Sequence, residues 1–426
     1  MIGTRTRRAL PAAFVVVAVL ALPANAGAAT QPTVHSVRTG GAVALSDTGG
    51  APTTIESLLV PRGSWTVTAN VTAVDFGSGD FVRCTLQKNG AGFDGGATTY
   101  VDDTVADLTN AGVVKTTAAA TTIALVCQHD HNAPNPSQFY LDPGATLTAV
   151  EGGPIRSAAA AASAGPNVVQ KRTPAQTALS PDTSTLVEQL RVPAGTWAFH
   201  TNLSVVNFGD FDFAGCELFG PTGTGDVGEQ QVVVGGDPDV VVSNIAMQGA
   251  RTYAKATTVK LTCSAAYTDS VYVDPGATVI ATRVAPADVV FDFDTKGVLS
   301  DTGGVTTTVF HRSMPAGAWR VSSAQTGELS NPNHSIGGGT DFVRCGLYAG
   351  GTRIDGGATT RISTGTGGGN YEQMIVESGT RTAKKPWTLS VRCSHDATIA
   401  TGSHWVVFSA SPVVAIRQGP IESSVI

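Results

Sequence analysis

A threefold internal repeat constrains this chain more than any other feature of its sequence. A Pro-x-Gly-x-Trp segment ends at Trp65, at Trp197 and at Trp319. An Asp-Phe-x-x-Cys segment follows each tryptophan, and a second cysteine closes each unit. Self-similarity at a period of roughly 120–130 residues indicates one structural unit used three times. A chain of 426 residues is therefore predicted to form several domains of one kind.

The residues after each tryptophan alternate between apolar and polar. Trp65, Val67 and Ala69, for example, alternate with two threonines and an asparagine, which predicts strands with one buried face. Pro-x-Gly, Phe-Gly and Asp-Pro-Gly clusters supply turns between such strands, because Pro fixes φ and Gly accepts positive φ. The predicted fold class is all-β, with three tandem antiparallel β-sandwich domains that are jelly-roll-like, and with hardly any helix.

The first 26 residues are predicted to be a signal peptide. Arginines precede an apolar run from Ala9 to Leu22, and Ala24-Asn25-Ala26 offers a cleavage site. This run is short of the ~20 residues that span a bilayer, and no second apolar span follows. We therefore expect a secreted, extracellular protein with no membrane span after cleavage, exported by either the general or the twin-arginine route.

Changes in composition mark the domain boundaries. A low-complexity segment with five consecutive alanines separates the first two repeats, whereas only Val284 to Ala287 separates the second from the third. Repeats 2 and 3 should therefore be tightly coupled. The predicted parts are the signal peptide at 1–26, repeat 1 at 33–150, an Ala/Gly/Pro linker at 151–167, repeat 2 at 168–283, repeat 3 at 288–417 and a C-terminal tail at 418–426.

Six cysteines occur, two per repeat at matched positions. In an exported chain this pattern predicts one disulfide inside each repeat. Strand alternation places both sulfurs of a repeat on the apolar side, and each bridge should stabilise its repeat by about 4 kcal/mol. The alternatives are a metal site or a redox centre, and against both of them the sequence has no C-x-x-C segment. The predicted bridges are Cys84–Cys127, Cys216–Cys263 and Cys345–Cys393.

Recurring aspartates are the most site-like feature of the sequence. One precedes the first cysteine of each repeat and another follows it, while a His-Asp pair follows the second cysteine in repeats 1 and 3 only. If loops gathered their oxygens, these aspartates could bind Ca²⁺. The favoured alternative is that they cap their own turns and need no ion. The candidate calcium ligands are Asp80, Asp94, Asp130, Asp341, Asp355 and Asp396.

No motif for catalysis stands out. The sequence has no G-x-S-x-G, no H-E-x-x-H and no glycine-rich phosphate loop. His129, Asp130 and a serine could form a triad only if the fold brought them together. We therefore predict a protein that is not an enzyme and has no cofactor, with an extracellular hydrolase as the less favoured alternative.

Charge and aromatic residues narrow the choice of partner. A net charge of -6, from 27 basic and 33 acidic residues, argues against nucleic acid and anionic membranes, because both attract a basic surface. The repeated tryptophans are expected in the core. Trp387 and Trp405 occur only in repeat 3, and Trp405 aligns with Tyr140 and Tyr272. A core position is favoured for both over a sugar-stacking platform.

The Pro-x-Gly-x-Trp strand, the Asp-Phe-x-x-Cys strand and the Asp-Pro-Gly-Ala-Thr tail together resemble a known domain style. They are similar to the jelly rolls of the complement globular head and tumour-necrosis-factor superfamily, in the versions found in secreted bacterial proteins. That resemblance implies sandwiches that commonly assemble as trimers, so we expect a monomer folded as an intramolecular pseudo-trimer. The expected function is binding an extracellular glycan or protein; the alternative is a structural matrix role.

Overall fold

The structure is a computed structural model. The predicted signal peptide lies outside the residues that it describes, as do the five alanines of the linker. The described residues are 32–77, 79–101, 104–132, 138–152, 155–157, 167–210, 212–221, 227–234, 242–293, 297–330, 340–363, 372–396, 404–407, 412–419 and 421–425.

Repeat 1 folds as two antiparallel sheets. One has the order β1-β11-β4-β8, with β10 and β2 beside the far end of β4; the other has the order β3-β9-β5-β7. Apolar side chains from both sheets form one core between them. The strands are β1 (Val34–Arg38), β2 (Val43–Ala44), β3 (Thr53–Val60), β4 (Gly63–Asp75), β5 (Asp80–Lys88), β6 (Ala91–Gly92), β7 (Ala97–Val101), β8 (Thr104–Thr116), β9 (Thr121–His129), β10 (Phe139–Leu141) and β11 (Thr146–Gly152).

Repeat 2 has the same strand order. Its sheets run β13-β22-β16-β19 and β15-β20-β17-β18, with β21 and β14 beside the far end of β16. The strands are β13 (Val168–Arg172), β14 (Thr177–Ala178), β15 (Thr185–Val192), β16 (Gly195–Asn207), β17 (Asp212–Phe219), β18 (Gly228–Val234), β19 (Val242–Tyr253), β20 (Thr257–Ala265), β21 (Val271–Val273) and β22 (Thr278–Val284).

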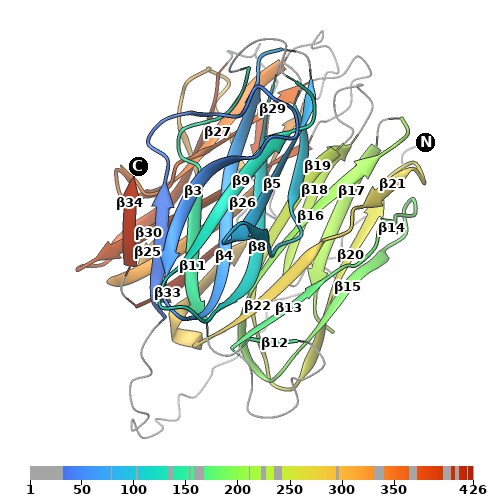
Figure 1. Cartoon of the computed structure of the whole chain (residues 1–426). Helices are drawn as coiled ribbons and strands as arrows, with labels where there is room; N and C mark the ends of the chain where they lie inside the picture. The colour runs from blue at the N-terminus through green and yellow to red at the C-terminus, as the bar shows by residue number, and fades with distance from the viewer. Residues whose placement is uncertain are drawn as a thin grey trace, which may run out of the picture. The chain divides into compact units, whose positions relative to one another are not determined.

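Repeat 3 follows after a single 3-10 turn, η2 (Pro286–Asp288), and has the order β23-β33-β26-β30 against β25-β31-β27-β29. Two facing sheets, each built on four strands in this order, make each repeat a jelly roll, which confirms the predicted all-β class (Figure 1). The strands are β23 (Val289–Phe293), β24 (Gly297–Val298), β25 (Thr307–Met314), β26 (Gly317–Ser330), β27 (Thr340–Ala349), β28 (Thr352–Arg353), β29 (Ala358–Ser363), β30 (Glu372–Ala383), β31 (Trp387–His395), β32 (His404–Val407) and β33 (Pro412–Gln418).

The repeated tryptophans and cysteines fill equivalent places in the three cores. Each tryptophan is fully buried, and its indole Nε1 donates a hydrogen bond to the carbonyl of the proline in its own motif, as from Trp65 to Pro61 at 3.1 Å. The Pro-x-Gly turn therefore satisfies the one polar group that burial of the ring would strand. All three predicted disulfides are present, each between directly opposed residues of neighbouring strands.

The three repeats contact one another through equivalent positions. In each contact, a residue of β7, β18 or β29 bonds to the side chain that lies seven residues after the next repeat's tryptophan. Repeat 1 thus contacts repeat 2, repeat 2 contacts repeat 3, and repeat 3 contacts repeat 1. The hydrogen-bonded pairs are Thr98 with Ser204, Gln230 with Thr326, and Thr359 with Thr72.

Two segments that the sequence suggested were connections form strands. Within the predicted linker, β12 (Ile155–Ser157) pairs in parallel with β13 of repeat 2. Within the predicted tail, β34 (Ile421–Val425) pairs in parallel with β1 of repeat 1, red beside blue in Figure 1. A Gly-Pro-Ile sequence leads into both strands, so each extends its own repeat into the sheet of another. No helix in the described ranges is long and apolar enough to cross a membrane.

Candidate functional site

The first candidate calcium ligand, Asp80, is buried and already fully engaged. Its carboxylate accepts hydrogen bonds from the backbone N–H groups of Phe81 and His131 and lies 3.2 Å from His129 Nδ1 and 2.8 Å from His131 Nδ1. Burial alone would raise the pKa of Asp80, but these hydrogen bonds outweigh it and hold the pKa below its usual value. The same contact raises the pKa of the exposed His131, because the carboxylate of Asp80 favours the protonated imidazole. This carboxylate anchors a loop.

His129 is buried between two acceptors. Its Nδ1 faces Asp80 and its Nε2 faces the backbone carbonyl of Ser46, and repeat 3 repeats the arrangement with His395, Asp341 and Ser300. Because both ring nitrogens are engaged away from solvent, this imidazole has no free face for a substrate. The suggested triad of His129, Asp130 and a serine is not assembled, since Asp130 points to Arg83 instead.

The remaining candidate aspartates are engaged separately. Asp130 forms a bidentate pair with Arg83, and Asp396 forms the same pair with Arg344. Asp94 accepts a hydrogen bond from Asn110 at 2.7 Å, and burial raises the pKa of Asp94 to about 6. Asp355 pairs with Arg353 at 3.0 Å. Within the described ranges, no three His, Cys, Asp or Glu side chains form a group that could hold a metal ion.

The Asp-Gly-Gly and Asp-Pro-Gly motifs meet each other at contacts between repeats. A methyl group built on Gly95 would stand 1.9 Å from the carbonyl oxygen of Gly276, and one on Gly356 would stand 1.9 Å from that of Gly144. Only glycine allows two backbones to approach this closely. These motifs therefore position repeats against one another, a role that the sequence did not suggest.

An exposed aromatic pair recurs at one end of repeats 1 and 2. Phe76 directly follows β4 and contacts Tyr140 at a ring-centroid distance of 5.8 Å; Phe208 directly follows β16 and contacts Tyr272 at 5.7 Å. Phe76 and Phe208 are 64% and 69% exposed. Sequence reasoning treated these Phe-Gly segments only as turns. Their matched position, eleven residues after each tryptophan, was the signal that could have found them.

Additional groups lie at the same end of the sandwich. Tyr267, in the loop after β20, is 67% exposed and packs edge-on against Phe213. In repeat 1 the exposed His131 occupies the corresponding loop after β9. This end of repeat 2 therefore exposes the rings of Phe208 and Tyr267, and the same end of repeat 1 exposes those of Phe76 and His131.

The alignment of Trp405 with Tyr140 and Tyr272 is wrong. Tyr140 and Tyr272 stand opposite residues nine positions after their tryptophans, whereas Trp405 stands opposite Leu329, ten positions after Trp319. Val406 is therefore the equivalent of the two tyrosines. Trp387 is half-buried and packs against the core of repeat 3.

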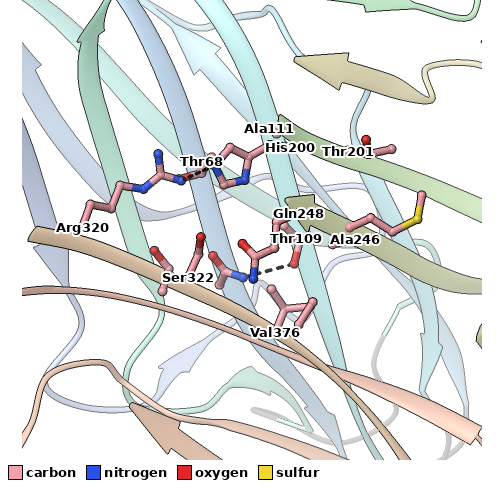
Figure 2. Close-up of a pocket in the computed structure, with 14 residues that line it drawn as sticks. Thr68, Thr109, Ala111, His200, Thr201, Ala246, Gln248, Arg320, Ser322 and Val376 are labelled. Carbon is pink, nitrogen blue, oxygen red and sulfur yellow. Dashed lines mark hydrogen bonds between the residues drawn. The ribbon is translucent and has the colours of Figure 1, made fainter. Parts of the chain in front are cut away.

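A small cavity, lined by both polar and apolar side chains, lies where the three repeats meet (Figure 2). Its 14 lining residues come from β4 and β8, from β16 and β19, and from β26 and β30. Its volume is about 20 Å³, the space of one water molecule. Thr68, His200 and Ser322, each three residues after a repeated tryptophan, face it from the three repeats.

Comparison with known proteins gives architectural likeness alone. No protein-family profile and no curated protein match the chain. Among solved structures, a triple jelly roll from the turret of an archaeal virus has 9% identity, covers 95% of this chain and 100% of its own, with a TM-score of 0.19. Infectious bursal disease virus strain Gx has 11% identity, 86% and 74% coverage, and a TM-score of 0.21. The tandem CBM22 domains of Paenibacillus barcinonensis Xyn10C have 9% identity, cover 58% of this chain and 91% of their own, and have a TM-score of 0.16. We take no function from likenesses this low.

Proposed function

We propose that this chain is an exported, non-enzymatic binding protein that contacts an extracellular ligand with the exposed aromatic pairs at the ends of β4 and β16. The recurrence of the Phe76–Tyr140 pair as Phe208–Tyr272 is the observation that carries the proposal. A folded protein gains nothing by holding a phenylalanine two-thirds in solvent, whereas a ligand that stacks on it removes that area from water.

Repetition of the pair supports a ligand that is itself repetitive. The three repeats contact one another in a ring through equivalent residues. The C-terminal ends of β4 and β16 therefore lie on the same side of this ring. Two weak contacts on one polymer reinforce each other through effective concentration. Of the two ligand classes expected from sequence, a polysaccharide fits this repetition better than a single globular protein does.

The electrostatics of the candidate sites support a role without catalysis. The two buried histidines that resemble a catalytic base are each held by an aspartate and a backbone carbonyl. The predicted calcium ligands are separately occupied by arginines, an asparagine and backbone N–H groups. An acid or base needs access to the reacting atoms, and these groups are committed to the fold.

Secretion is part of the proposal. Three disulfides persist best in an oxidising compartment, and the N-terminal sequence has the form of a signal peptide. The cyclic contacts support an intramolecular pseudo-trimer and, with the jelly-roll topology, the resemblance to the complement and tumour-necrosis-factor superfamily. We keep that assignment as a proposal.

The decisive experiment measures binding of the mature chain to an array of extracellular polysaccharides and to cell-wall preparations. We expect Phe76→Ser combined with Phe208→Ser to weaken binding at least tenfold and the single changes to weaken it less, because the remaining pair still holds the polymer. Leu59→Ser is the matched control: Leu59 is 67% exposed but lies at the other end of the sandwich, before the turn into β4.

A structural matrix role is the alternative, and the same preparations distinguish it. Concentration-dependent assembly of the purified chain, with no binding to any polysaccharide and no effect of the Phe76 and Phe208 changes, would replace a binding role with a structural one. Hydrolysis of a polymer by the wild-type chain, lost on His129→Gln, would overturn both.

A further inference from the structure

The cavity between the repeats holds a buried cation without an acidic partner. Arg320 is 4% exposed, and no carboxylate is among the residues that line the cavity with it. Its Nη2 donates to the hydroxyl of Thr68 at 3.3 Å and lies 3.1 Å from Nε2 of His200. Figure 2 shows the guanidinium directed toward that histidine. Both of these partners are uncharged hydrogen-bond acceptors.

Arg320 remains charged at neutral pH. Burial lowers its pKa to about 10, which is still well above 7. Burial, and then the charge of Arg320, lowers the pKa of His200 well below its usual value, so the imidazole is neutral and Nε2 accepts the hydrogen bond. A full positive charge therefore lies within the contact of three repeats, where transfer from water without compensation is costly.

Several donors on the cavity wall have no partner among the described residues. They are Nε of Arg320, the Nε2 amide of Gln248, and the hydroxyls of Thr201 and Ser378, and all four side chains are at least nine-tenths buried. Native structures rarely leave this many buried donors unsatisfied around one space. A water molecule would fill the volume and bond to some of them, but it would leave the charge uncompensated.

We infer that the cavity is a binding site for a single monatomic anion, a halide such as chloride, with Arg320 as its charge partner and the amide of Gln248 and neighbouring hydroxyls as its hydrogen-bond donors. The volume of about 20 Å³ accommodates a particle of about the size of water, and a halide ion is of that size. The anion would be held by all three repeats, since Arg320 and Ser378 belong to repeat 3, Gln248 to repeat 2 and Thr68 to repeat 1. It would therefore stabilise their association.

The first test is thermal unfolding of the mature chain in mixtures of sodium chloride and sodium gluconate at constant ionic strength. Because an ion that binds only the folded state stabilises by mass action, we expect the midpoint to rise by about 2 °C for each tenfold increase in chloride above its Kd. Bromide should act similarly. Arg320→Met keeps the length of the side chain without its charge, and should abolish the dependence on chloride.

Arg312→Met is the control. Arg312 is an arginine of the same repeat that pairs at the surface with Asp292, so its removal should leave the halide dependence unchanged. A dependence that persists in folded Arg320→Met would place the ion elsewhere and overturn the inference, as would equal midpoints in chloride and gluconate for the wild-type chain.

A second measurement does not require any variant to fold. Crystals of the wild-type chain grown in sodium bromide should show an anomalous peak inside the cavity, close to Arg320 Nε and Gln248 Nε2. A cavity filled by water alone gives no anomalous peak there, and that result overturns the inference. Neither experiment depends on the polysaccharide proposal, since the exposed aromatic pairs do not line this cavity.

Discussion

Two of the three contacts between repeats are built alike, and the third is built differently. Where repeat 1 meets repeat 2 and where repeat 3 meets repeat 1, an Asp-Gly-Gly motif packs glycine to glycine against an Asp-Pro-Gly motif. At both, an arginine of the first strand, Arg172 or Arg38, also donates to the carbonyl of the motif's aspartate. Where repeat 2 meets repeat 3, the bond between Gln230 and Thr326 has equivalents at the other two contacts, but the amide of Gln230 also donates to the carbonyl of Ala324.

This difference explains a gap in the repeated motifs. Repeat 2 lacks Asp-Gly-Gly and repeat 3 lacks Asp-Pro-Gly, so the glycine-to-glycine contact cannot form between these two repeats. The parallel strands β12 and β34 follow the same division, since they reinforce only the two glycine contacts. Repeats 2 and 3 are joined through the short turn η2, so the chain itself holds them together.

The largest effect should come from breaking one glycine contact. Gly95→Ala places a methyl group 1.9 Å from the backbone of Gly276, and neither backbone can yield without separating the repeats. We expect a loss of about 3 kcal/mol in the free energy of unfolding, at the upper end for overpacking, measured by denaturant titration. Gly356→Ala should behave alike.

Gly92→Ala is the control for this pair, because nothing lies within 4 Å of the added methyl group. If Gly95→Ala and Gly92→Ala unfold at the same denaturant concentration, the close approach of the two motifs does not contribute to stability, and the distinction between the contacts disappears.

The two glycine contacts differ in the partner of the aspartate that begins the Asp-Gly-Gly motif, which is Asp94 in repeat 1. Its counterpart Asp355 has a charged partner, Arg353, whereas the partners of Asp94 are uncharged: the amide of Asn110 and backbone N–H groups. Burial raises the pKa of Asp94 to about 6, so the folded state holds a proton that the unfolded state releases. Its contribution is full below the ordinary pKa of about 4 and is lost as the pH rises through about 6.

Asp94→Asn should therefore remove a stability loss of up to ~3 kcal/mol that the wild-type chain shows between pH 4 and 7. Thermal midpoints across that range measure the effect, and the variant's advantage should grow with pH. Glu56, whose pKa burial raises to about 7, remains in both chains and gives a common background. Parallel pH profiles for the two chains would contradict the assignment to Asp94.

The smallest effect concerns the strand that closes the cycle. Deleting residues 419–426 removes β34 and its pairing with β1, together with the 3.1 Å contact of His35 and Glu422. We expect a loss of about 1–2 kcal/mol, since a few exposed strand hydrogen bonds are involved, and faster amide exchange in β1. Removal of Ile426 alone is the control. Unchanged exchange in β1 would show that the pairing does not persist in solution.

Much of the fold could be predicted because its determinants are local. Alternation after Trp65 and its two equivalents specifies strands with one buried face, and cysteines at matched positions in an alternating pattern specify bridges within a repeat. The candidate site was less predictable. From the sequence, Asp80 and Asp130 could have bound one metal ion together. In the structure the backbone N–H of His131 bonds to Asp80, whereas Arg83 bonds to Asp130.

The register of strand pairing was also not predictable from the sequence. Trp405 and Tyr140 look equivalent when the three repeats are aligned by their shared motifs, yet the strand pairing of Trp405 is shifted by one residue, and loop lengths between strands do not reveal such a shift. The strand β34 could not be found either, because its partner β1 lies at the opposite end of the chain.

The amino-acid sequence by itself determined the repeated β-sandwich, its buried tryptophans and its three disulfides, because these depend on alternation and on pairs within one unit. Only the tertiary structure decided which glycine motifs meet, which repeat receives β12 and β34, and where Arg320 is buried without an acidic partner. Apart from β12, which pairs with the neighbouring strand β13, those features depend on distances between groups that are far apart in the sequence, and such distances follow from the packing of whole sheets.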